Sequence, residues 1–117
     1  MIQVKFKNLE KSYLAESAVI DRLEPVVEKF PDLKAAKILV TLEMENSPRQ
    51  AGLDHFNVKV YITRGRYKDI ALTKSNSSMY VALAEVVDHM LEKLNRFGDK
   101  ARVKQRQRAR VISQNMG

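Results

Sequence analysis

Apolar and polar residues alternate along four stretches of this chain, and a period of two predicts β-strands with one buried face. In the first stretch, apolar Ile2, Val4 and Phe6 are separated by polar residues. The alternation returns three times, so we expect strands at residues 2–7, 36–45, 55–63 and 70–75. A polar loop at 46–54 and a turn around Gly65 separate the last three strands.

Two other segments have apolar residues every three or four positions, the spacing that predicts an amphipathic helix. The first helix is expected to begin after Ser12, its N-cap, and to kink or lose its last turn at Pro25. The second is expected to begin after Ser77 or Ser78 and to end at Gly98. The expected apolar stripes consist of Ala15, Val19, Leu23, Val26, Val27 and Phe30 in the first helix and Tyr80, Leu83, Ala84, Val87, Met90, Leu91 and Leu94 in the second.

The expected order is therefore β-α-β-β-β-α, an α+β fold in which two helices pack on one face of a four-stranded sheet. This arrangement buries the apolar face of each strand and the apolar stripe of each helix in one core. We expect a binding domain at residues 1–98 and a basic, flexible C-terminal tail at residues 99–117. The other face of the sheet then carries Lys5, Lys7, Lys37, Thr41, His55, Asn57, Lys59 and Tyr61.

Composition narrows the class of protein. A chain of 117 residues with 44% hydrophobic residues suits one small domain with a core. It has no cysteine, which excludes disulfides and is compatible with a reducing cytoplasm. No apolar run approaches the roughly 20 residues that a membrane span needs, and the first residues lack a signal-peptide core. We expect a cytoplasmic protein with no membrane partner.

Motifs for catalysis or metal binding are missing from the sequence. His55 and His89 are not spaced as a pair of ligands, and no phosphate-binding glycine motif or nucleophile elbow occurs. Glu43 and Glu45 share one strand face, where two acids are far more often ordinary solvated surface than an acid/base pair. We expect no enzyme, no cofactor, no metal and no small-molecule substrate.

Positive charge is concentrated at the C-terminus of a chain whose net charge is +7. Residues 99–117 hold six cations and one acid, whereas residues 1–98 hold fifteen cations and thirteen acids. A basic arm on a nearly neutral body favours a polyanionic partner, nucleic acid ahead of an anionic membrane or a merely solubilising role. The six cations occupy every second position: Lys100, Arg102, Lys104, Arg106, Arg108 and Arg110.

A period of two suits an extended chain better than a helix. In an extended chain all six cations lie on one side, about 6.6 Å apart, which approximates the phosphate spacing of a single nucleic-acid strand. A helix would spread them around its circumference. We therefore favour a tail that is disordered when free and extended along RNA when bound, with a helical extension as the alternative.

Two further groups of cations are candidates for RNA binding. Around the expected turn, Lys59, Arg64, Arg66 and Lys68 are interleaved with Tyr61 and Tyr67. Basic and aromatic residues together suit RNA phosphates and unstacked bases. Tyrosine is also common in ordinary strands, so RNA binding and an ordinary strand are equally supported here. On the second helix, His89, Lys93, Arg96 and Lys100 share one face. Met79 and Tyr80 are expected to belong to the core.

The second helix resembles the signature of the ribosome hibernation promoting factor family, also called the sigma-54 modulation family. The matching residues are Met79-Tyr80, Ala82, Lys93-Leu94, Arg96 and Asp99-Lys100, and the similarity extends over roughly residues 1–104. The resemblance implies a β-α-β-β-β-α fold and a short member without a dimerisation domain, which we expect to be a monomer when free. It also implies binding to the small ribosomal subunit and its ribosomal RNA, in the channel for messenger and transfer RNA, to idle ribosomes during starvation or stationary phase.

Carried over by position, the resemblance makes Lys93, Arg96 and Lys100 contacts to ribosomal RNA. The family usually has lysine where this chain has His89, so we expect binding to strengthen as the pH falls through about 6.5, where imidazole gains a proton. Two alternatives stay open: a general double-stranded RNA-binding module, whose order of elements is similar, and a regulator of a sigma factor.

Overall fold

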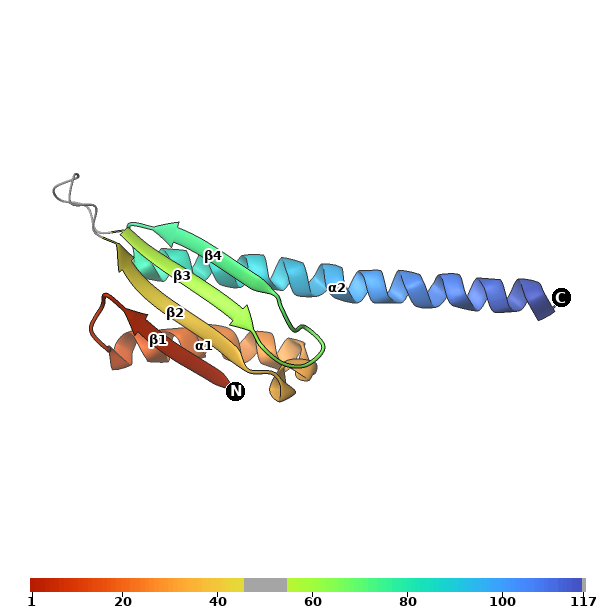
Figure 1. Cartoon of the computed structure of the whole chain (residues 1–117), viewed down its shortest axis with the longest axis horizontal. Helices are drawn as coiled ribbons and strands as arrows, with labels where there is room; N and C mark the ends of the chain where they lie inside the picture. The colour runs from red at the N-terminus through yellow and green to blue at the C-terminus, as the bar shows by residue number, and fades with distance from the viewer. Residues whose placement is uncertain (46–54, 117) are drawn as a thin grey trace.

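The computed structural model describes the backbone of residues 1–45 and 55–116 and the side chains of residues 1–45 and 55–97. Its elements follow the expected order β-α-β-β-β-α (Figure 1). They are β1 (Ile2–Lys7), α1 (Tyr13–Lys29), the short 3-10 helix η1 (Pro31–Ala35), β2 (Ile38–Glu45), β3 (His55–Ile62), β4 (Ala71–Asn76) and α2 (Met79–Met116). The loop expected at residues 46–54 lies outside the described residues.

The four strands form one sheet in the order β1-β2-β3-β4, in which β1 and β2 are parallel and the other neighbours are antiparallel. A parallel pair needs a crossover connection, and α1 supplies it. Both helices cover the same face of the sheet, with α1 beside β1 and α2 behind β3 and β4 (Figure 1). The predicted α+β fold is confirmed. Within the described segments, neither helix has an apolar stretch long enough to cross a membrane.

The core lies between the sheet and the two helices, as the alternation of apolar residues predicted. Side chains from α1 and α2 cover the apolar face of the sheet. This burial stabilises the fold, because each Å² of apolar area removed from water contributes about 25 cal/mol. The largest fully buried side chains are Leu23, Leu33, Ile38, Leu42, Ile62, Leu83, Met90 and Leu94. The apolar residues of β1 are partly buried against this cluster.

Helix α1 begins and ends where local chemistry predicts. The Ser12 hydroxyl accepts a hydrogen bond from the backbone N–H of Ala15 at 3.3 Å, which confirms Ser12 as the N-cap. Pro25 lies inside the helix on its exposed side, and the helix continues past it to Lys29, so the expectation that the last turn is lost at Pro25 is wrong. Pro31 then opens η1, as expected from the bias against helix in the residue before a proline.

Helix α2 differs from expectation in which residues of its first turns are buried. Tyr80 is 50% exposed and is not a core residue, whereas Ala82 and Val86 are fully buried. The sequence permits both stripes, because apolar residues surround the start of this helix on every side. The sheet selects the side that carries Ala82 and Val86, which continues into Met90 and Leu94. The expectation that Tyr80 packs in the core is therefore wrong.

Helix α2 also continues beyond the point where we expected it to end. Its backbone is helical through Gly98 to Met116, 38 residues in all, so the expectation that Gly98 stops the helix is wrong. A glycine inside a helix costs only about 1 kcal/mol relative to alanine, and no proline follows it. The residues around it are mostly strong helix formers. In Figure 1, α2 extends far past the edge of the sheet.

Candidate nucleic-acid interface

The β3–β4 turn presents a group of the predicted cations. Gly65 adopts φ +87°, a left-handed conformation that glycine tolerates, which confirms the predicted turn. The Ile62 N–H donates to the Ile70 carbonyl at 3.0 Å and the Asp69 N–H donates to the Ile62 carbonyl at 2.9 Å, so the base of the turn is closed. Arg64 and Lys68 are exposed on it.

Tyr67 anchors the turn to the helical layer. It is only 5% exposed, and its ring packs edge-on against Phe30 at 6.2 Å and against Phe97 at 5.2 Å between ring centroids. Its ring is therefore part of the core and is not free to stack on a base. Tyr61 differs, because it is 39% exposed. Its hydroxyl donates to Asp69 at 3.1 Å, and this hydrogen bond and the carboxylate charge raise the pKa of Tyr61.

Arg66 joins the turn to η1 and to α2. Its Nη1 lies 3.1 Å from Asp32 Oδ2 of η1, and its guanidinium lies over the rings of Tyr67 and Phe97 at 5.8 and 5.7 Å. A guanidinium stacked on aromatic rings has a cation–π attraction of roughly 0.5–1 kcal/mol at exposed sites. Arg66 is thus engaged within the protein, and it holds the turn beside the part of α2 that contains Phe97.

The cations of α2 lie next to this junction. Lys93 and Arg96 are exposed, and His89 is half-buried with its Nδ1 enclosed and without a hydrogen-bond partner. At about 100° per residue, the three fall within an arc of about 60° on the helix. Since Arg96 precedes Phe97, the structure brings the helix cations and the turn cations to the same end of the molecule. For Lys100 and the five cations after it, the structure describes only the helical backbone.

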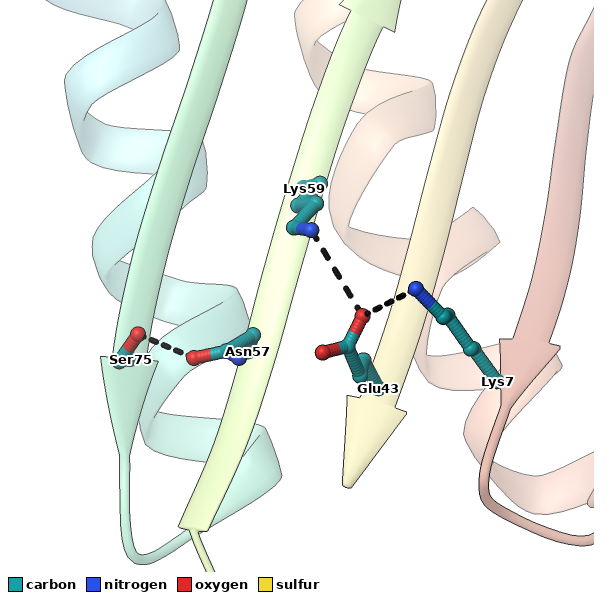
Figure 2. Close-up of polar contacts among 5 residues, drawn as sticks. All are labelled: Lys7, Glu43, Asn57, Lys59 and Ser75. Carbon is teal, nitrogen blue, oxygen red and sulfur yellow. Dashed lines mark hydrogen bonds and ion pairs between the residues drawn. The ribbon is translucent and has the colours of Figure 1, made fainter. Parts of the chain in front are cut away.

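Lys59 is separated from the other candidates. It lies on β3, on the face of the sheet that the helices leave open, and its Nζ is 3.6 Å from Glu43 Oε2 (Figure 2). Lys7 reaches the same oxygen from β1 at 3.5 Å. Figure 2 shows the carboxylate between the two lysines, and it is only 6% exposed. The expectation that Glu43 is ordinary solvated surface is therefore wrong.

The environment of Glu43 keeps it ionised. Burial alone would raise the pKa of the Glu43 carboxyl, but the ammonium groups of Lys59 and Lys7 outweigh that cost and hold the pKa below its ordinary value. The same row of the sheet continues to Asn57, whose amide oxygen accepts a hydrogen bond from the Ser75 hydroxyl (Figure 2). Within this row, Glu43 offsets part of the positive charge of Lys7 and Lys59 on the open face.

Two basic residues near the turn were missing from the sequence-based candidates. Lys34 of η1 and Lys37, just before β2, line one pocket together with Arg64 of the turn. The lysines are three residues apart with no acid between them, which was the only signal in the sequence. For metal binding, the described residues contain no cluster of three or more His, Asp or Glu side chains.

The protein is thus a small α+β domain with a long projecting helix, and exposed cations lie on its β3–β4 turn and on α2. A family described as "Sigma 54 modulation protein / S30EA ribosomal protein" matches residues 2–102, and the chain belongs to this family. The family comprises ribosome-associated modulation factors rather than enzymes. This confirms the family that the signature in the second helix suggested.

Solved structures have the same fold at low sequence identity. A ribosomal subunit interface protein from Coxiella burnetii matches with a TM-score of 0.68 and 10% identity, over 84% of this chain and 97% of that one. The N-terminal domain of Protein Y from Thermus thermophilus matches with a TM-score of 0.59 and 17% identity, over 81% of this chain and 94% of that one. A comparison with curated protein sequences found no match.

Proposed function

We propose that this protein is a hibernation factor that binds the small ribosomal subunit in the channel for messenger and transfer RNA and idles ribosomes during starvation or stationary phase. The observation that carries the proposal is the junction of the β3–β4 turn with α2. The turn, which carries exposed Arg64 and Lys68, contacts Phe97 of α2, and exposed Lys93 and Arg96 precede Phe97 on the same helix. The ribosome-associated family and the fold shared with a ribosomal subunit interface protein support it.

The proposed action is occupancy, without a catalytic step. Exposed lysine and arginine side chains bind phosphates irrespective of base sequence and release counterions from the RNA, which supplies affinity. Lys93 and Arg96 are the central contacts, and Arg64 and Lys68 extend the surface along the turn. A folded body held in the channel then excludes messenger and transfer RNA by volume.

The remaining candidates take different parts in the proposal. Arg66 positions the turn, since it is paired with Asp32 and stacked on Phe97. Lys59 contributes less, because Glu43 offsets its charge. The helix α2, about 57 Å long at 1.5 Å per residue, carries Lys100 to Arg110 away from the body, toward RNA that the domain itself does not reach. We place the protein in the cytoplasm as a monomer when it is free of ribosomes.

Sedimentation of the protein with ribosomal subunits tests the proposal. We expect the purified chain to co-sediment with small subunits and to be displaced by excess transfer RNA and messenger RNA. The double variant Lys93→Glu/Arg96→Glu should not co-sediment. A matched variant with the same change of charge, Lys5→Glu/Lys11→Glu, should bind as the unchanged protein does, and circular dichroism should show that both variants are folded.

Two outcomes contradict the proposal. One is undiminished binding of Lys93→Glu/Arg96→Glu, which removes the α2 face from the interface. The other is equal affinity for the small subunit and for an unrelated RNA duplex, which instead identifies a general double-stranded RNA-binding module.

A further inference from the structure

A pocket of about 240 Å³ lies where the start of β1, the start of β2 and the β3–β4 turn meet. These three segments lie at the same end of the sheet (Figure 1). Six residues line the pocket: Met1, Lys34, Ala35, Ala36, Lys37 and Arg64. Three of these side chains, Lys34, Lys37 and Arg64, are cations, and none of the six is an acid.

Backbone hydrogen bonds fix the walls of this pocket. The Lys37 carbonyl accepts two hydrogen bonds from Thr63, one from its N–H at 3.0 Å and one from its hydroxyl at 3.3 Å. Because Arg64 follows Thr63, these bonds hold the backbones of Lys37 and Arg64 side by side. The Ile38 N–H donates to the Met1 carbonyl at 2.8 Å, and this hydrogen bond holds the start of β1, which forms the third wall, beside the start of β2. The backbone carrying two of the cations is thus in place before any ligand arrives, which lowers the entropic cost of binding.

Within the part of the chain whose side chains are described, the three cations of the pocket have no ion-pair partner. Among residues 1–45 and 55–97, ion pairs shorter than 4.0 Å engage Lys7, Lys59 and Arg66, and none engages a cation of the pocket. Asp32, the acid of η1, is held by Arg66.

Lys34 also borders a neighbouring groove whose lining includes Glu24 and Glu28, but neither of these acids lines the pocket. Three like charges around one cavity repel one another, and an anion placed among them relieves that repulsion.

We propose that the pocket formed by Lys34, Lys37 and Arg64 is a binding site for one phosphate group. Its volume is below the range of about 300–1,000 Å³ that is usual for drug-sized ligands, so it suits a single oxyanion group. The forked guanidinium of Arg64 matches two oxygens of a phosphate, and the lysines add point charges. The phosphate comes from an RNA chain that continues across the turn to α2, and this last assignment rests on the proposed function.

A titration with inorganic phosphate tests the site without ribosomes. The full chain, labelled with ¹⁵N, is titrated at constant ionic strength while the amide shifts of Lys37, Thr63 and Arg64 are followed by NMR. We expect a saturable response confined to these amides. Lys34→Gln/Lys37→Gln should weaken it at least about tenfold, since a hydrogen bond to a charged group contributes that much or more. The matched variant Lys5→Gln/Lys11→Gln should stay within about twofold of the unchanged protein.

Linear shifts spread over all basic residues, and alike in the three proteins, would overturn the site. A second arm adds a single-stranded RNA hexamer with a 5′-hydroxyl, which carries only internal phosphodiesters. Displacement of inorganic phosphate by the hexamer supports RNA as the source. Binding of phosphate without displacement overturns the RNA assignment and leaves a site for free phosphate. Neither result depends on whether Lys93→Glu/Arg96→Glu abolishes ribosome binding, so the two proposals fail separately.

Discussion

Removing the ring of Phe97 should loosen the junction between the β3–β4 turn and α2 by a calculable amount. Phe97 is 39% exposed, so about three-fifths of its surface is buried. Full burial of a phenylalanine stabilises a protein by about 1.5–3 kcal/mol, so this partial burial contributes about 1–2 kcal/mol. The edge-on pair with Tyr67 at 5.2 Å and the guanidinium of Arg66 at 5.7 Å add about 0.5–1.5 kcal/mol.

We therefore expect Phe97→Ala to lower the free energy of unfolding by about 2–3 kcal/mol. Phe97→Leu is the matched variant, because leucine keeps most of the apolar burial and loses only the aromatic contacts. It should cost about 0.5–1.5 kcal/mol. Urea denaturation followed by circular dichroism measures both values, with an unchanged dependence on urea concentration as the sign that the compared states are the same. A cost below about 0.5 kcal/mol for Phe97→Ala, or equal costs for both variants, would refute the role of the ring in this junction.

Three further predictions concern the tail, the open sheet face and the turn. Deleting residues 101–117 should reduce the slope of log affinity for ribosomes against log salt by about three if four or five phosphate contacts are lost, with little change in melting temperature; an unchanged slope would make the tail a solubilising appendage. Glu43→Gln should destabilise the fold at pH 7, because the ion pairs lower the pKa of Glu43 and so stabilise the folded state above the unfolded pKa of about 4.3. This difference should shrink as the pH falls through the folded pKa, and a difference that persists at pH 2.5 in thermal melts would contradict the ion-pair explanation. Gly65→Ala should cost about 1–2 kcal/mol in urea denaturation, because an added Cβ meets nothing closer than 3.8 Å and only the positive φ is strained; Gly65→Asn should cost less, and the reverse order would show that contact and not φ decides.

The fold could be predicted because its signals are local. Alternation places Val58, Val60 and Ile62 on one side of β3 whatever that side meets, and the structure buries all three. The cap at Ser12 depends on residues three positions apart, and it was also found. At the start of α2 the local signal is ambiguous, because apolar residues surround the helix, and only the packed sheet selects Ala82 over Tyr80.

The candidate site could be predicted only in part. Exposed Lys93 and Arg96 follow from helical spacing. The engagement of Arg66 does not, because its partners Asp32 and Phe97 lie more than thirty positions away on either side in the sequence. Lys34 was missed for the same reason, since its relation to Arg64 exists only when η1 and the turn meet. The contacts of all these residues with RNA stay predictions.

By itself, the sequence determined the order of elements, the buried faces of the strands and the uneven distribution of charge, because each depends on residues that are neighbours along the chain. The tertiary structure alone decided which cations are paired with an acid and which are not, among the described residues. Glu43 offsets Lys7 and Lys59 because pairing of β1, β2 and β3 brings three separate strands within ion-pair distance. Lys34, Lys37 and Arg64 gather in one pocket, with no acid among its described lining residues, because the chain folds back on itself at one end of the sheet. Coulomb interactions depend on distance in space and not on separation along the chain, so only the folded molecule specifies them.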